Sequence, residues 1–161
     1  MIVVGIDPGL SGAIAILENN KVLNIFDMPV MAEGKKNKRQ LNSAQLVNII
    51  KDSTKPDAEK AVVVEQVNAM PGQGVTSMFN FGQTFGAIKG VCAALELPIF
   101  FVRPSKWKKH FELINSSKDA SRTKVIEMYP SLANQLTKKK DVNKSDAILI
   151  ARFHFETKIN D

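Results

Sequence analysis

Cysteine and histidine are scarce in this sequence, which contains one cysteine and two histidines. Cys92 cannot form a disulfide within the chain, and its apolar surroundings predict a buried core residue rather than a reactive thiol. Structural zinc takes four cysteine or histidine ligands, so the distant His110 and His154 give no zinc site, and we expect surface or packing roles for both. These features together indicate a reducing, cytoplasmic location.

Long apolar runs and targeting signals are also missing. No run approaches the roughly 20 residues that span a bilayer, so we expect no membrane partner. The first residues are typical of a strand and include a carboxylate, Asp7, which argues against a signal peptide. The sequence has no P-loop and no serine–histidine–aspartate order. Residues 7–12 are similar to the phosphate-1 motif of actin-like ATPases and sugar kinases, but those proteins need a second, similar domain, and 161 residues are too few for it. We therefore expect no nucleotide cofactor.

Positive charge is in excess, with a net charge of +6, and it is concentrated in four segments. Such clusters of lysine and arginine favour a polyanionic partner, most naturally nucleic acid. The alternative is that these runs are only solvated loops that keep the protein in solution. The candidate phosphate-binding residues are Lys35, Lys36, Lys38, Arg39, Lys106, Lys108, Lys109, Lys118, Arg122 and Lys124.

Five apolar runs predict the strands of a sheet. Residues 2–7, 12–17 and 22–28 are joined by short links and predict an antiparallel meander. Residues 61–65 and 99–102 flank a helical stretch, and a strand–helix–strand crossover makes these two strands parallel. The expected fold class is α/β, with a central five-stranded mixed sheet flanked by helices on both faces, in a single domain over residues 1–161.

Between the strands, the composition predicts helices and loops. Residues 30–40 are polar and aperiodic and predict a loop. Asn42 is a good N-cap for a helix that Pro56 prevents from continuing. Ser116 and Asp119 predict a capping box for a second helix.

Near the end of the chain, residues 134–142 predict a basic loop, and residues 143–158 predict the last helix. A long helix is expected over residues 75–96. Three glycines recur in it at every fourth position, Gly82, Gly86 and Gly90. Each glycine costs a helix interior about 1 kcal/mol relative to alanine, so we expect another backbone to approach this face.

Two of the predicted strands end in carboxylates, Asp7 and Glu65. If these strands are neighbours, the two carboxylates meet, and like charges held close must take up a proton or a cation. Hard oxygen ligands favour Mg²⁺ or Mn²⁺. Asp146, in the first turn of the last helix, is the natural third ligand, and Asp141 lies just before that helix. The alternative is that Asp7 is only a turn residue and that Asp146 only completes a capping box with Asn143.

Three motifs in this order resemble the RuvC family of Holliday junction resolvases, which have the RNase H-like fold. The residues that carry the resemblance are Gly5-Ile6-Asp7-Pro8-Gly9, Val64-Glu65-Gln66-Val67 and Ser145-Asp146-Ala147-Ile148-Leu149-Ile150-Ala151. Residues 69–75 and 79–82, together with Lys139-Lys140-Asp141, resemble the bacteriophage and prophage branch of that family. The similarity extends over nearly the whole chain and implies a location in a bacterial cell or a phage-infected host.

The resemblance implies a homodimer that binds branched DNA, above all four-way junctions, and nicks two strands symmetrically. Asp7, Glu65 and Asp146 fall on the family's catalytic carboxylates. The hypothesis is phosphodiester hydrolysis with two Mg²⁺ ions in each active site, for which Mn²⁺ substitutes. Asp7 would contact both ions, Glu65 one of them and Asp146 the other. The helix over residues 75–96 is the candidate subunit contact.

The chain departs from the bacterial members of the family at two positions. A fourth carboxylate is usual three residues before the last one, and Asn143 stands there in this chain. Either Asn143 or Asp141 is then an additional ligand, or three carboxylates suffice. An aromatic residue that stacks into the junction is replaced by Asn68, so we expect Asn68 and Met70 to contact DNA, with Met70 or Phe79 as the wedge.

Two other functions stay open at this point. One is a monomeric RNase H-like nuclease that cuts RNA in an RNA–DNA hybrid. It differs from a junction resolvase in its oligomeric state and its substrate. The other is a branched-DNA-binding protein with a decayed active site, and Asn143 is the residue that supports it.

Overall fold

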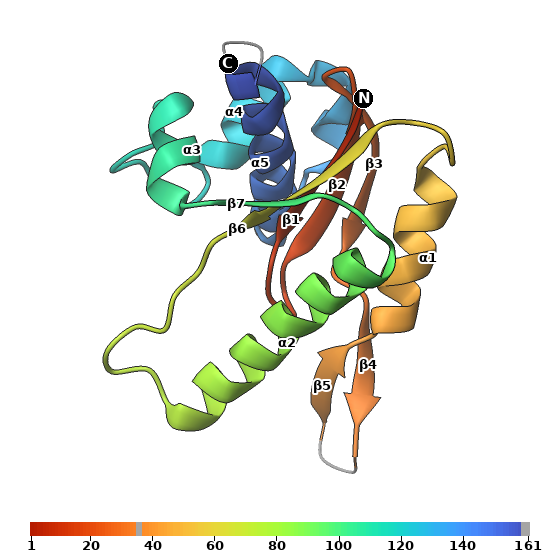
Figure 1. Cartoon of the computed structure of the whole chain (residues 1–161). Coiled ribbons are helices and arrows are strands. Elements are labelled where there is room, and N and C mark those ends of the chain that lie inside the picture. Colours follow the sequence, from red (N-terminus) through yellow and green to blue (C-terminus); the bar gives the residue numbers. More distant parts are fainter. Residues whose placement is uncertain (35–36, 159–161) are drawn as a thin grey trace.

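A five-stranded mixed sheet lies at the centre of the structure (Figure 1), a computed structural model that describes residues 1–34 and 37–158. Its strands are β1 (Ile2–Asp7), β2 (Ala13–Glu18), β3 (Lys21–Asp27), β6 (Lys60–Glu65) and β7 (Ile99–Val102), in the spatial order β3-β2-β1-β6-β7. The β1–β2 and β2–β3 pairs are antiparallel, whereas β1–β6 and β6–β7 are parallel. This arrangement confirms the predicted α/β class, with a meander of three strands joined to two parallel strands.

Helices cover both faces of the sheet, as predicted (Figure 1). One face carries α1 (Ser43–Ser53) and α2 (Val75–Ala94), and the other carries α5 (Val142–Lys158) with α3 (Pro104–His110) and α4 (Ala120–Met128) beside it. Two apolar cores result, one on each face of the sheet. We call them the α2-side core and the α5-side core.

Strand β1 is buried on both faces and supplies alternate residues to the two cores. The even-numbered residues of 2–6 belong to the α2-side core, whereas Val3 belongs to the α5-side core. At Gly5, a Cβ atom would lie 2.2 Å from the carbonyl oxygen of Ala147 and 2.8 Å from the Cβ of Ala151. Real Cβ atoms do not come this close to other atoms, so the glycine allows α5 to lie directly on β1.

Several local predictions are confirmed. The side chain of Asn42 accepts a hydrogen bond from the backbone N of Gln45 at 3.0 Å and caps α1. Cys92 is fully buried in the α2-side core. His154 is also buried, and its ring packs 4.8 Å from that of Phe100, which gives it the expected packing role.

The prediction of a loop over residues 30–40 is wrong. Strand β4 (Val30–Glu33) pairs antiparallel with β5 (Lys38–Leu41) in a separate two-stranded sheet that projects away from the central one (Figure 1). Most side chains of this hairpin are exposed, so its strands lack the apolar alternation by which a half-buried strand is recognised. Two of the predicted DNA-binding residues, Lys35 and Lys36, lie outside the described residues.

The predicted capping box at Ser116 and Asp119 is also wrong. Helix α4 begins at Ala120, and the side chain of Asp119 makes no capping hydrogen bond. Its carboxylate instead binds the guanidinium of Arg122, which is the stronger partner because both groups are charged. Part of the predicted basic loop forms two short 3₁₀ helices, η1 (Pro130–Gln135) and η2 (Lys139–Asp141), and α5 begins directly afterwards at Val142.

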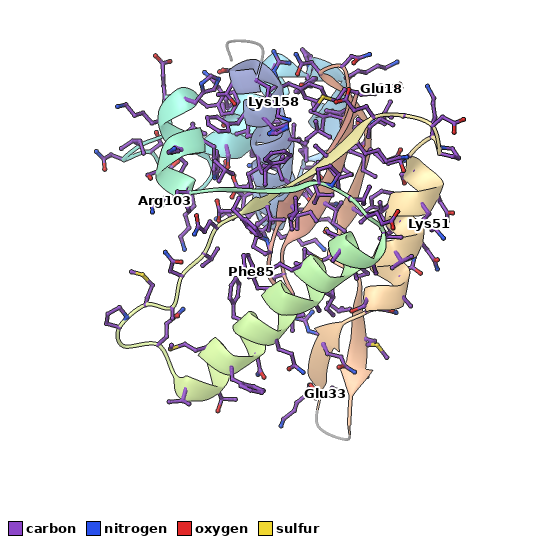
Figure 2. The ribbon with its side chains drawn as sticks, viewed as in Figure 1. Glu18, Glu33, Lys51, Phe85, Arg103 and Lys158 are labelled. Atoms are coloured by element: carbon purple, nitrogen blue, oxygen red, sulfur yellow. The ribbon has the colours of Figure 1, made fainter. Side chains whose placement is uncertain are left out.

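Helix α2 is confirmed as one continuous helix, but no backbone approaches its glycines within the described chain. A Cβ atom placed at Gly82, Gly86 or Gly90 would meet no atom within 4 Å. The opposite side of the helix faces the sheet, where the Phe85 ring points toward β7 and lies 5.5 Å from that of Phe101 (Figure 2). The expected close approach is therefore wrong within this chain, and a contact with a second copy stays a prediction.

In the part of the chain that the structure describes, no helix is both long enough and apolar enough to cross a membrane.

Candidate active site

Asp7 and Glu65 stand next to each other at the ends of neighbouring parallel strands. The register of β1 and β6 aligns the two positions, and adjacent strands lie about 4.8 Å apart. Side chains alternate along a strand, so Asp7 follows Gly5 onto the face that carries α5, and Glu65 follows Val63 of the α5-side core onto the same face. The two carboxylates therefore converge, as the sequence predicted.

Asp146 reaches the same face of the sheet from α5. It directly precedes Ala147, whose carbonyl oxygen lies against Gly5. Asp146 interacts electrostatically with both Asp7 and Glu65, and the hydroxyl of Ser121 in α4 forms a hydrogen bond with it. The direct contact of α5 with β1 is thus what completes the group of three carboxylates.

Burial raises the pKa values of all three carboxyl groups, and repulsion between carboxylates adds to the rise at Asp7 and Asp146. Burial is the largest cause at Asp7, and the charges of Glu65 and Asp146 add to it, so that the pKa of Asp7 rises to about 8. Burial also raises the pKa of Asp146, to about 6, and that of Glu65. A site that holds protons on buried carboxyl groups near neutral pH is one that would exchange those protons for a cation.

Two neighbours of the carboxylates come from α3 and were not assigned to the site by sequence reasoning. The indole Nε1–H of Trp107 donates a hydrogen bond of 2.7 Å to Oε2 of Glu65. The ammonium group of Lys108 acts on all three carboxylates and lowers their pKa values, and it lies 5.4 Å from the centre of the Trp107 ring. Lys108 was predicted only to grip DNA. The only feature of the sequence that distinguishes Trp107 is that it is a single tryptophan within a basic segment.

The donor set fits divalent metal ions that are shared between carboxylates. Among the described residues, no three acidic, histidine or cysteine side chains are arranged to enclose a single ion. Two ions that share Asp7 need only two protein carboxylates each, with water and phosphate oxygens as the other ligands, which is the usual way in which Mg²⁺ is held. Glu65 would then be the second protein ligand of one ion and Asp146 of the other.

The two candidate additional ligands both make contacts within the chain. Asp141 accepts a hydrogen bond from the backbone N of Lys138 at 2.8 Å and pairs with Lys144 at 3.4 Å. Burial acts to raise the pKa of Asp141, but these contacts outweigh it and lower the pKa. Asp141 therefore stabilises the start of α5 and is engaged within the chain. The side-chain nitrogen of Asn143 donates to the carbonyl oxygen of Ser11 at 2.6 Å, which ties α5 to the loop after Asp7.

Two hollows flank Asn143, which borders both. The first measures about 350 Å³ and is lined in part by Lys108, Lys118 and Asp146. The second measures about 340 Å³ and is lined in part by Ser11, Arg39 and Lys140. The first hollow thus places Lys108 and Lys118 beside Asp146, and the second presents Arg39 and Lys140 next to the loop that follows Asp7.

The other predicted DNA-binding residues differ in their exposure to solvent and in whether they already bind another residue. Lys38 is exposed on β5, Lys106 and Lys109 are exposed on α3, and Lys124 is partly buried on α4. Arg122 is occupied, because its guanidinium binds Asp119 and donates to the carbonyl oxygen of Leu136 at 3.0 Å.

The segment after Glu65 leaves apolar side chains uncovered. Asn68 is exposed, the exposed fraction of Met70 is 61%, and that of Phe79, in the first turns of α2, is 71%. Met70 and Phe79 are the two positions at which a DNA wedge was predicted.

Fold and site together define a nuclease of the RNase H-like class, in which carboxylates at the ends of central strands hold divalent metal ions. The family model described as crossover junction endodeoxyribonuclease RuvC matches residues 3–154, so the chain belongs to the RuvC family. Enzymes of this family depend on divalent metal ions, and membership makes the chain a hydrolase of DNA phosphodiester bonds at crossover junctions.

Solved structures with the same fold agree with this assignment. The RuvC structure from Thermus thermophilus is 19% identical, with a TM-score of 0.60 over 99% of this chain and 97% of that one. Thermus thermophilus RuvC in complex with a Holliday junction substrate is 17% identical, with a TM-score of 0.65 over 99% and 96% of the two chains. The fowlpox virus Holliday junction resolvase is 18% identical, with a TM-score of 0.54 over 98% and 99%. No curated protein is significantly similar to the chain in sequence.

Proposed function

We propose that the chain resolves four-way DNA junctions by paired, symmetric nicks, as a homodimer with two Mg²⁺ ions in each active site. The observation that carries this proposal is the convergence of Asp7, Glu65 and Asp146 on one face of the sheet, beside hollows lined with basic residues. Residues 1–161 would act as one nuclease domain, in the cytoplasm of a bacterial cell or a phage-infected host.

The carboxylates would hold the ions with distinct roles. When bound, the two Mg²⁺ ions would supply a nucleophilic water at neutral pH and stabilise the oxygen that leaves the phosphate. Asp7 would be shared between the ions because it is the carboxylate on which the charges of both Glu65 and Asp146 act. The raised pKa of Asp7 supports this role, because a cation relieves the same repulsion that the proton does. Mn²⁺ would substitute for Mg²⁺.

The scissile strand would follow the two hollows across Asn143. Lys108 and Lys118 would contact phosphates on one side of the carboxylates, and Arg39 would do so on the other. Such contacts position DNA without reading its sequence. Lys38, Lys106, Lys109 and Lys124 would add to the basic surface around this path.

Two symmetric cuts need two sites, and α2 is the proposed contact between subunits. Its first turns carry exposed Val75 and Phe79, and the exposed glycines 82, 86 and 90 leave room for a second backbone. Large exposed apolar side chains beside such glycines are typical of a surface that contacts another protein. Met70 and Phe79 lie at the same end and are the proposed residues that open the centre of the junction.

The test is incubation of the protein with a labelled four-way junction, a linear duplex and an RNA–DNA hybrid in Mg²⁺. We expect paired nicks in the junction alone, and we expect Asp7→Asn to lose at least about 100-fold in rate while it still binds the junction in a salt-dependent way. Cleavage of the hybrid by a monomer would instead select the RNase H-like alternative. Junction binding by the wild type without cleavage would select a decayed nuclease.

A further inference from the structure

Trp107 is the only tryptophan in the chain, and its side chain is fully buried in the α5-side core. A buried indole N–H needs a hydrogen-bond partner, and backbone carbonyl groups commonly serve. Here the partner is Oε2 of Glu65, at 2.7 Å, from an element 42 residues away in sequence. A core residue is thus bonded directly to one of the carboxylates assigned to the active site.

The packing of the indole ring fixes where its N–H points. Trp107, on α3, is fully buried in the apolar cluster that also contains Phe111, Val102 of β7 and Ile148 of α5, and this burial restricts how far the ring can turn. A donor that cannot move holds its acceptor in one place. The Glu65 side chain has three rotatable bonds, and the hydrogen bond to Trp107 removes most of that freedom at its far end.

The same bond leaves the two oxygens of Glu65 unequal. Oε2 is engaged by Trp107, whereas in the part of the chain that the structure describes no hydrogen bond reaches Oε1. A carboxylate held in this way presents one oxygen to an ion. Mg²⁺ takes carboxylates through single oxygens in a strict octahedron, whereas Ca²⁺ often takes both oxygens of one carboxylate.

We propose that Trp107 is a positioning residue that fixes Glu65 as a ligand through one oxygen, which favours Mg²⁺ over Ca²⁺, and that its indole reports when an ion binds. This inference rests on the proposed function, because it assumes that Glu65 holds an ion. The raised pKa of Glu65 is consistent with it, because burial raises that pKa while the bond to Trp107 opposes the rise.

Trp107→Phe tests the proposal because it keeps an aromatic ring and removes the N–H. Calorimetric titration with Mg²⁺ and with Ca²⁺ should show Mg²⁺ binding weakened by about 10-fold or more, the usual effect of losing a hydrogen bond to a metal ligand, with a smaller change for Ca²⁺. The midpoint of Mg²⁺ dependence in junction cleavage should shift by a similar factor. Unchanged Mg²⁺ affinity and unchanged preference for Mg²⁺ over Ca²⁺ would overturn the proposal.

Phe111→Leu is the matched control, since Phe111 packs in the same core and touches no carboxylate by hydrogen bond. It should lose stability in thermal denaturation yet keep the Mg²⁺ affinity of the wild type. An equal loss of Mg²⁺ affinity in both variants would mean that packing alone is responsible, and the positioning role would be rejected.

The wild type offers a second readout that needs no cleavage. Titration with Mg²⁺ should change the tryptophan emission until the site is saturated, and Glu65→Ala should abolish that change. A wild-type protein that binds no Mg²⁺ would overturn the proposed function and this inference together. A wild type that binds Mg²⁺ and cuts junctions, beside a Trp107→Phe protein with the same affinity and selectivity, would overturn this inference alone.

Discussion

At the scale of single residues, the burial of Asp7 links the proposed chemistry to the stability of the fold. Burial and the neighbouring charges raise its pKa from an ordinary value of 3.8 to about 8. Between these two values the folded chain binds more protons than the unfolded chain, so the free energy of unfolding falls as the pH rises from about 4 to about 8. This is opposite to the usual effect of a carboxylate that forms an ion pair.

Asp7→Asn should therefore stabilise the protein in the presence of a chelator at pH 8. One pKa unit corresponds to about 1.4 kcal/mol, so the raised pKa of Asp7 predicts a gain of at least about 1 kcal/mol, or about 2–4 °C in Tm. The gain should disappear near pH 4, where the wild-type carboxyl is protonated. Circular dichroism melts from pH 4 to pH 8 measure this effect, with the exposed Asp57→Asn as control. A lower Tm for Asp7→Asn at pH 8 would contradict the prediction.

The carboxylates of the site were predictable from sequence, whereas their neighbours were not. Asp7 and Glu65 each end an apolar run, which is a local signal that strand pairing then brings together. Trp107 and Ser121 meet them only through the packing of α3 and α4, and no local pattern encodes that packing. Asn143 was considered as an additional ligand because it stands where the family usually has a fourth carboxylate, whereas its hydrogen bond to Ser11 depends on a loop 132 residues earlier and could not be predicted.

At the scale of elements, the contact of α5 with β1 sets the spacing of the site. Gly5 has no side chain, so Ala147 and Ala151 lie directly against the strand. Asp146 directly precedes Ala147 on α5, so its position depends on how closely the helix approaches the strand. Any separation of α5 from β1 would therefore move Asp146 away from Asp7.

Gly5→Ala should consequently reduce both stability and activity. The added methyl group would overlap the Ala147 carbonyl, and such overpacking costs about 1–3 kcal/mol, or a fall of roughly 2–12 °C in Tm. A displacement of about 1 Å between catalytic groups can cost about 100-fold in rate, so cleavage should fall more than the loss of folded protein explains. Thermal denaturation and junction cleavage at a temperature where the variant is folded measure the two effects. Gly74→Ala, at an open position, should change neither, and a Gly5→Ala protein of wild-type activity would refute the argument.

Elements with strong periodicity were predicted well, and exposed ones were not. Strands β1, β2 and β6 are apolar runs that are almost entirely buried, and α1 buries Leu46, Ile49 and Ile50 along one side. The β4–β5 hairpin is held by pairing between its own backbone groups and buries little, so its residues show no such pattern. The start of α4 was misplaced because Asp119 binds Arg122 instead of capping the helix.

At the scale of the whole molecule, a substitution on the open glycine face of α2 should affect the stability of one subunit and the formation of the dimer in opposite directions. Gly86→Ala should stabilise the helix of the isolated subunit by up to about 1 kcal/mol and so raise its Tm, because the new methyl group meets nothing within 4 Å. If α2 is the subunit contact, the same methyl group should weaken the dimer and replace paired nicks by single ones. Analytical ultracentrifugation and the ratio of single to paired nicks measure this effect.

A substitution on another exposed part of the molecule provides the comparison. Lys51→Ala, on α1, should leave both the sedimentation behaviour and the nicking ratio unchanged. A Gly86→Ala protein that dimerises as tightly as the wild type would place the subunit contact elsewhere.

The active site draws its residues from both ends of the chain, and this has a consequence for synthesis. A ribosome makes Asp7 first and Glu65 second, while Asp146 is made near the end, on the helix that also forms half of the α5-side core. A nascent or prematurely terminated chain that lacks α5 has neither the last carboxylate nor a packed sheet. If the three carboxylates act together as proposed, such a chain would be unable to cut DNA, and nuclease activity would arise only when almost all of the chain has been translated.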